Sequence, residues 1–173
     1  KNCNLITSDK WVSKARNEKS NMVQKPESFI LHEYSQDDST LDTQTYLQNS
    51  QKFFMEYMEF NDIRYNFYIN KNGDIYEARQ IFYRSTDNPF YYSDGQINIA
   101  VEGKFENEEP TKKKLESLSF LKSLLTEKYL LNPMKVFAHR DFVNNNCPED
   151  NLYNYLTSFQ LQKHIRKFLT KKN

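Results

Sequence analysis

Two kinds of hydrophobic spacing alternate along this chain, and the alternation limits the folds that it can adopt. Short apolar runs are typical of buried strands, whereas apolar residues at every third or fourth position are typical of amphipathic helices. The expected strands are 28–34, 65–70, 75–78, 96–102 and 135–139, and the expected helices lie near 42–59, 111–129 and 152–169. This order predicts an α/β fold in which three helices flank a mixed central β-sheet.

The stretch from Tyr65 to Arg79 carries the clearest local signal. Two strand-like runs flank the dipeptide Asn72-Gly73, which favours a two-residue type I′ turn because both of its central residues need a positive φ. The sequence therefore predicts an antiparallel hairpin at 65–79.

Composition bounds the class of protein. The 173 residues suffice for one domain with a sizeable core, and we find no repeat or linker that divides them, so we expect a single domain over 1–173. Aromatic residues make up 15% of the chain, which argues against disorder. The net charge of +1 gives no sign of a nucleic-acid partner. No apolar stretch is long enough for a membrane span, and we expect a monomer.

A histidine and a cysteine stand eight positions apart in the segment FAHRDFVNNNCPED, residues 137–150. His139 ends a predicted strand, Cys147 follows in a loop, and His32 lies in another predicted strand. Two imidazoles and a thiolate would make a zinc site with an open fourth position, the catalytic type. The alternatives are a buried histidine with an inert thiol, or a disulfide between Cys3 and Cys147. Spacing alone does not choose among them.

Six blocks that together span nearly the whole chain carry a family resemblance. They are CNLITSDKWVSKA (3–15), FILHEY (29–34), QKFFMEYMEFNDIRYNF (51–67), GDIYEAR (73–79), QINIAVEGKF (96–105) and AHRDFVNNNCPEDNLY (138–153). In order and spacing they resemble the motifs of the peptidoglycan recognition proteins, which share their fold with type 2 zinc amidases and amidase-type phage lysozymes. The pattern SIGIxxxGNF appears as the fifth block. The pattern GHRDVxxTxCPGxxLY appears as the sixth, which is the most specific match.

The resemblance implies a function and a set of site residues. His32, His139 and Cys147 fall on the family's zinc ligands, and Tyr65 falls on the tyrosine that assists catalysis. Many members lack the cysteine and only bind peptidoglycan, but this chain keeps it. The resemblance thus implies a secreted, Zn²⁺-dependent N-acetylmuramoyl-L-alanine amidase of innate immunity. It would cleave the lactyl–L-alanine amide of peptidoglycan or muropeptides.

Asn145 departs from the family pattern at a position that matters for catalysis. Amidases carry Thr, Ser or Lys there, two residues before the cysteine. An asparagine amide can donate a hydrogen bond to an oxyanion but brings no positive charge. We therefore expect Asn145 to serve as a second catalytic donor beside Tyr65, in an enzyme slower than typical family amidases.

Other departures lie around the ligand groove. Glu33 replaces the second histidine of the pattern HHT, and alternation along a strand should turn it away from His32. Arg64 replaces a glycine. The segment 83–95, which helps form the groove in the family, has lost its Gly-Ala-His sequence. These changes leave two rival functions open: a non-catalytic peptidoglycan sensor or immune modulator, and a protein-binding module that keeps only the fold.

Overall fold

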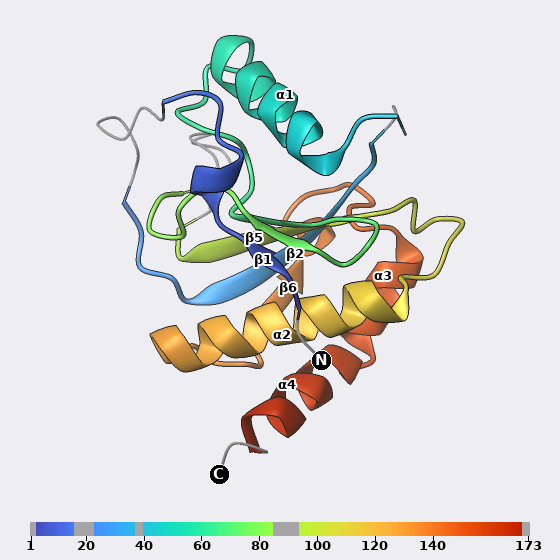
Figure 1. The fold of residues 1–173 in the computed structure, drawn as a ribbon. Coiled ribbons are helices and arrows are strands. Elements are labelled where there is room, and N and C mark those ends of the chain that lie inside the picture. The colour runs from blue at the N-terminus through green and yellow to red at the C-terminus, as the bar shows by residue number, and fades with distance from the viewer. Residues whose placement is uncertain (1–2, 16–22, 37–39, 85–93, 171–173) are drawn as a thin grey trace.

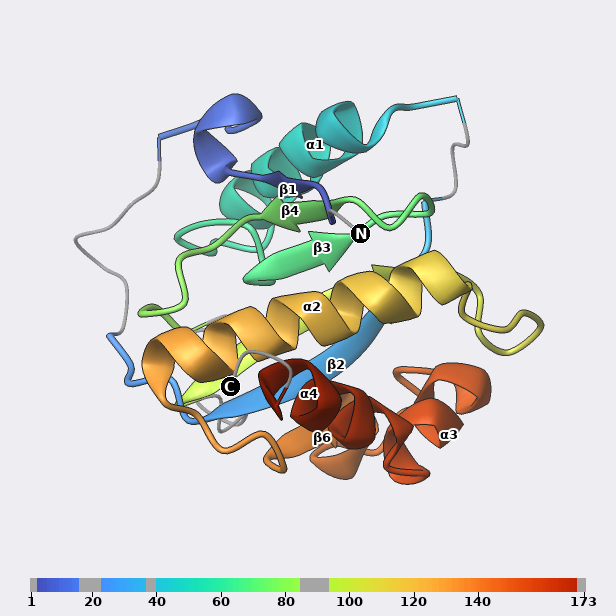
Figure 2. The same cartoon turned by 60° about the horizontal axis from the view of Figure 1, so that its bottom comes forward.

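The computed structural model describes residues 3–15, 23–36, 40–84 and 94–170, apart from the side chains of residues 168 and 169. It consists of three layers (Figures 1 and 2). A β-sheet forms the middle layer, α1 covers one face, and α2, α3 and α4 lie on the other side. The predicted α/β class is therefore confirmed. The altered groove segment falls mostly outside the described residues.

The sheet is mixed, as predicted, and has six strands among the described residues. They are β1 (Leu5–Ile6), β2 (Ser28–Tyr34), β3 (Phe67–Ile69), β4 (Ile75–Glu77), β5 (Gln96–Glu102) and β6 (Val136–Ala138). Their order across the sheet is β1-β4-β3-β5-β2-β6. Neighbours run parallel except β3 and β4, which are antiparallel. The short edge strand β1 was not predicted from the sequence.

The hairpin of β3 and β4 is confirmed, but its turn is not of type I′. Gly73 has a φ of 82°, whereas Asn72 is not among the described residues with positive φ. The loop instead comprises Lys71, Asn72 and Gly73, and the Asn70 amide donates to the Asp74 carbonyl across its base at 3.0 Å. The Asn70 side-chain oxygen accepts from the amides of Asn72 at 3.0 Å and Asp74 at 2.8 Å. Such side-chain bonds to nearby backbone select the wider turn.

The helices of the described chain are α1 (Thr43–Glu56), α2 (Lys112–Tyr129), α3 (Asp150–Thr157) and α4 (Gln160–Thr170). The single helix predicted at 152–169 is therefore wrong, because it is two helices. Phe159 between them adopts a φ of 58°, a left-handed conformation that ends a helix. The Phe159 amide donates to the carbonyl of Leu156 at 3.1 Å. None of the described helices has the length and apolar character needed to cross a membrane.

The two faces of the sheet bury two separate cores. Odd-numbered residues of β2 and β5, such as Phe29 and Ile99, pack toward α2 and α3. Even-numbered residues, such as Tyr34 and Ala100, pack toward α1. This alternation follows from the two-residue period of a strand, and it places His32 on the α1 side.

Candidate metal centre

Strand register brings the two candidate histidine ligands together. β2 and β6 pair in parallel, with Leu31 opposite Ala138. Leu31 is followed by His32, which is still on β2. Ala138 is followed by His139, the first residue of the 3-10 helix η3 (His139–Asp141). Their ring centroids lie 4.7 Å apart. Both side chains are buried, with exposures of 2% and 9%.

Cys147 completes the cluster from the loop between η3 and α3. Its Sγ lies 3.9 Å from Nδ1 of His32. One ligand atom from each of His32, His139 and Cys147 can be chosen so that all three lie within 4.8 Å of one another. Both Cys147 and Cys3 are free thiols, so the alternative of a disulfide between them is not found.

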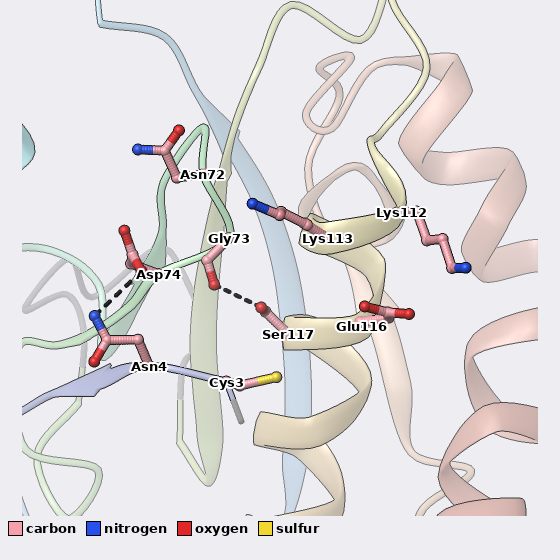
Figure 3. A pocket seen from close by; sticks show the side chains of 9 residues that line it. All are labelled: Cys3, Asn4, Asn72, Gly73, Asp74, Lys112, Lys113, Glu116 and Ser117. Carbon is pink, nitrogen blue, oxygen red and sulfur yellow. Dashed lines mark hydrogen bonds between the residues drawn. The ribbon is translucent and has the colours of Figure 1, made fainter. Parts of the chain in front are cut away.

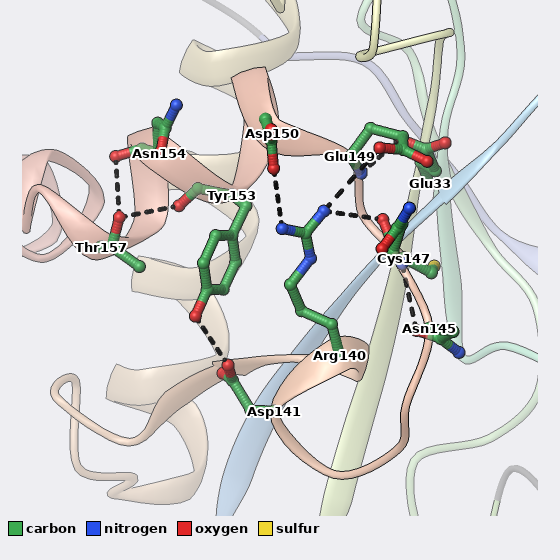
Figure 4. A network of polar contacts seen from close by, with 11 residues as sticks. Glu33, Arg140, Asp141, Asn145, Cys147, Glu149, Asp150, Tyr153, Asn154 and Thr157 are labelled. Carbon is green, nitrogen blue, oxygen red and sulfur yellow. Dashed lines mark hydrogen bonds and ion pairs between the residues drawn. The ribbon is translucent and has the colours of Figure 1, made fainter.

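Arg140 and Asn145 hold the cysteine loop in place (Figure 4). The backbone amide of Arg140 donates to the Cys147 carbonyl at 2.7 Å. The Arg140 guanidinium donates to the Asn146 carbonyl at 2.9 Å and to the Asp150 carboxylate at 2.8 Å. The Asn145 side-chain oxygen accepts from the Cys147 amide at 3.0 Å. The thiol is therefore positioned by backbone contacts on both sides.

Glu33 does not join the three candidate ligands. Its carboxylate accepts a hydrogen bond from the backbone amide of Glu149 at 2.8 Å, just before α3 begins. Figure 4 shows this carboxylate beside the start of α3. Glu33 therefore ties β2 to α3 and leaves the ligand set as two nitrogens and one sulfur.

Tyr65 and Asn145 both lie beside the cluster. The Tyr65 ring centroid is 4.4 Å from that of His32. Nδ2 of Asn145 lies 3.3 Å from Nδ1 of His139. In the sequence Tyr65 alternates with Phe67 and Ile69, which predicts that its ring lies on the same face of the sheet, but Tyr65 belongs to the other core. β3 begins only at Phe67, so the alternation does not reach Tyr65, which joins the core on the α1 side.

Asn98 is a neighbour of the cluster that the sequence analysis missed. Its side-chain oxygen lies 2.6 Å from Nε2 of His32. The signal that could have identified it is an amide in the middle of the otherwise apolar run INIAV, residues 97–101. A buried amide costs free energy unless it is hydrogen-bonded, so such a residue points to a specific partner.

Burial keeps the three candidate ligands uncharged at neutral pH. It lowers the pKa of His32 well below the usual range, and the neighbouring His139 adds to the effect. It also lowers the pKa of His139 to about 4, with a contribution from the Arg64 guanidinium. Burial raises the pKa of the Cys147 thiol. Neutral imidazoles carry the lone pairs that a metal needs, whereas the thiol must lose its proton on binding.

A separate pocket lies away from this cluster. A pocket of about 430 Å³ lies between the β3–β4 loop and the start of α2 (Figure 3). It is lined by Cys3, Asn4, Asn72, Gly73, Asp74, Lys112, Lys113, Glu116 and Ser117. It shares no residue with the cluster of His32, His139 and Cys147.

Comparison with known proteins establishes the family. The family model of N-acetylmuramoyl-L-alanine amidases matches residues 22–150. This chain belongs to that family.

The relatives and structural neighbours include peptidoglycan recognition proteins and an amidase. The chain is 27% identical to peptidoglycan-recognition protein SD of Drosophila melanogaster over 154 residues, which cover 86% of this chain and 82% of that protein. It is 29% identical to human peptidoglycan recognition protein 3 over 124 residues, which cover 71% of this chain and 36% of the human protein.

Two solved structures illustrate the shared fold. Drosophila PGRP-LB superposes with a TM-score of 0.79 at 23% identity, over 91% of this chain and 95% of that one. The amidase LysC of Clostridium intestinale gives 0.70 at 21% identity, over 92% and 98%. At these identities the superpositions show the fold alone.

Proposed function

We propose that this protein is a zinc-dependent amidase that cleaves the lactyl–L-alanine amide of peptidoglycan or of muropeptides. The observation that carries the proposal is the cluster of His32, His139 and Cys147, whose ligand atoms lie within 4.8 Å of one another. Membership of the N-acetylmuramoyl-L-alanine amidase family supports it. A variant of the similar PGRP-LB has been solved in complex with tracheal cytotoxin, which supports a peptidoglycan fragment as the ligand.

The residues present fit a zinc ion. Imidazole nitrogen and thiolate sulfur are the ligands that zinc prefers, and three protein ligands leave a fourth position for water or substrate. His32 would contribute Nδ1, since its Nε2 is committed to Asn98. When bound in such a site, zinc acts as a Lewis acid and lowers the pKa of bound water from about 15.7 toward about 7.

The chain's own polar groups would stabilise the negative charge that develops on the scissile carbonyl oxygen. The Tyr65 phenol is held beside the centre by packing of its ring against His32, and we assign it as the main hydrogen-bond donor. The Asn145 side-chain oxygen is bound by the Cys147 amide, so its donor is Nδ2, which lies 3.3 Å from Nδ1 of His139 and carries two N–H groups. Loss of one such donor typically slows turnover about a hundred- to a thousandfold.

Hydrolysis of a muramyl peptide by the zinc-loaded protein tests the proposal. We expect release of the stem peptide, near loss of turnover in Tyr65→Phe at equal zinc content, and faster turnover in Asn145→Thr. Tyr68→Phe is the matched control, because Tyr68 is also buried but its ring packs at a tilt against Tyr65, with ring centroids 5.5 Å apart, and not against His32. Cys147→Ser should lose the zinc. A wild type that holds zinc and releases no stem peptide would rule out the amidase.

The second candidate is a non-catalytic peptidoglycan sensor. The amide of Asn145, in place of a residue with a hydroxyl or ammonium group, favours it. Peptidoglycan binding without turnover in the same assay would select the sensor. Absence of both would direct attention to a protein-binding module. Secretion, a monomeric state and a single domain over residues 1–173 belong to the proposal, and sedimentation of the purified protein would test the monomer.

A further inference from the structure

We propose that Asn98 is a positioning residue that holds His32 in one tautomer and orientation, with Nδ1 turned toward the candidate metal centre. This role of Asn98 in metal binding rests on the proposed zinc site. The carrying contact is the 2.6 Å distance between Asn98 Oδ1 and His32 Nε2. On the other side of the same ring, Nδ1 faces Cys147 Sγ at 3.9 Å. Nε2 of His32 is thus hydrogen-bonded to Asn98, and Nδ1 faces the candidate ligands.

The orientation of the Asn98 amide follows from its second contact. Nδ2 of Asn98 donates to the carbonyl of Gln96 at 3.3 Å. If the amide were turned over, its oxygen would face that carbonyl, and two acceptors would oppose each other. The oxygen must therefore face His32, and a good hydrogen bond then requires the proton of the neutral imidazole on Nε2. The lone pair is left on Nδ1.

Asn66 holds the backbone of Asn98 in turn. The Asn66 side-chain oxygen accepts from the Asn98 amide at 2.8 Å, and the Asn66 amide donates to the Asn98 carbonyl at 3.0 Å. Nδ2 of Asn66 donates to the carbonyls of Arg79 and Gln80, each at 3.2 Å. Asn66 and Asn98 are 0% and 1% exposed. A rigid, water-excluded frame therefore stands behind His32.

Strand register explains why position 98 can reach His32. In the parallel pair of β2 and β5, Asn98 lies opposite Ile30 and His32 lies opposite Ala100. Asn98 and His32 are thus diagonal neighbours on one face of the sheet, within reach of each other's side chains. The family pattern SIGIxxxGNF places glycine at this position, which has no side chain to offer. The contact therefore uses a side chain that this pattern does not supply.

Nuclear magnetic resonance of the metal-free protein, labelled with ¹⁵N-histidine, tests the tautomer directly. We expect a single Nε2–H form of His32 in the wild type and in Asn98→Asp, which keeps the acceptor oxygen. Both tautomers should be populated in Asn98→Ala. Competition with a chromogenic chelator then measures zinc affinity. We expect a loss of about 10–100-fold in Asn98→Ala, as for other outer partners of metal-bound histidines, and recovery in Asn98→Asp.

Asn70→Ala is the matched control. Asn70 is also a buried amide, 3% exposed, but its Nδ2 donates to Thr43 at the start of α1 and to Asp74 in the hairpin, and not to His32. It should lower thermal stability without changing the tautomer or zinc affinity. The inference is overturned if Asn98→Ala keeps a single Nε2–H tautomer, or if both variants weaken zinc binding equally. A wild type that binds no zinc overturns the proposed function, while the tautomer still decides the role of Asn98.

Discussion

The two faces of the sheet differ in how completely their buried polar groups are hydrogen-bonded. On the α1 side, the amides of Asn66 and Asn98 have hydrogen-bond partners at both ends. On the α2 side, Lys122 Nζ, Thr126 Oγ1 and Gln162 Oε1 are buried without a hydrogen-bond partner among the described residues.

This difference separates two effects of a buried polar group. A partnered network fixes one geometry, because each alternative leaves some group unsatisfied. An unpartnered group only costs free energy. Lys122 is the extreme case: it is 0% exposed, and its Nζ lies 4.7 Å from the centre of the Phe29 ring. We infer that the hydrogen-bonded amides on the α1 side fix the geometry of the candidate metal centre. The unpartnered groups on the α2 side lower the stability of the fold.

The largest expected effect comes from breaking the partnered network. Asn66→Ala leaves the Asn98 amide and the carbonyls of Arg79 and Gln80 without their present partner. Each such buried group is worth about 1–3 kcal/mol, so we expect the free energy of unfolding to fall by at least about 3 kcal/mol. Urea denaturation measures it. A loss below about 1 kcal/mol would contradict the view that this network is rigid and dry.

On the α2 side we expect a substitution that raises the free energy of unfolding. Lys122→Met keeps a long side chain of similar shape and removes the buried amine. A buried polar group without a hydrogen bond costs about 1–3 kcal/mol, and we expect a gain in stability of that size at pH 7. Lys128→Met is the control, since Lys128 lies on the same helix and is exposed. A destabilised Lys122→Met would contradict this view and show that the amine contributes stability, for which its contact with the Phe29 ring is the candidate.

The dependence of stability on pH tests the same lysine without changing its shape. Burial lowers the pKa of Lys122 well below its usual range, so the unfolded chain binds more protons than the folded one below about pH 10.5. The free energy of unfolding therefore rises as pH rises and falls as pH falls, with a slope of at most about 1.4 kcal/mol per pH unit from this lysine. Denaturation of wild type and Lys122→Met between pH 7 and pH 10 should show a steeper rise in the wild type. Parallel curves would exclude a neutral buried lysine.

The smallest effect distinguishes two hydroxyl groups on α2. Thr126→Val removes an unpartnered hydroxyl at nearly constant shape, and we expect a gain of about 0.5–1 kcal/mol. Ser123→Ala removes a hydroxyl that donates to the Ser119 carbonyl at 2.7 Å, and we expect a loss of similar size. Thermal unfolding of both variants measures the difference. Equal effects would mean that hydrogen bonding does not distinguish these two positions.

Periodicity predicted the long elements well and the short ones poorly. β2 and β5 have the predicted bounds, 28–34 and 96–102, because seven residues suffice to display a pattern. The two residues of β1 cannot display one. The break between α3 and α4 depends on the backbone conformation of Phe159, and the turn at Asn72 depends on the competing Asn70 side chain. Neither is visible in hydrophobic spacing.

Some residues of the candidate site could be predicted from the sequence and others could not. The ligand set and Tyr65 were predicted because the family motifs name them, and the structure brings them together with Asn145. Asn98 was missed because no motif includes it. Its role depends on a diagonal contact between β2 and β5, which requires knowledge of which strands are neighbours and in what register.

The candidate centre can form only when β2 and β6 pair in the native register, so its presence reports correct folding. Leu31 lies opposite Ala138, and only this alignment sets His32 beside His139. A slip of one residue would turn alternate side chains of β6 to the wrong face of the sheet. A misaligned chain would therefore lack the ligand pair, and a metal that binds only the correct alignment would draw the population toward it by mass action. Zinc uptake during refolding would then count the molecules that have joined these two distant strands in native register.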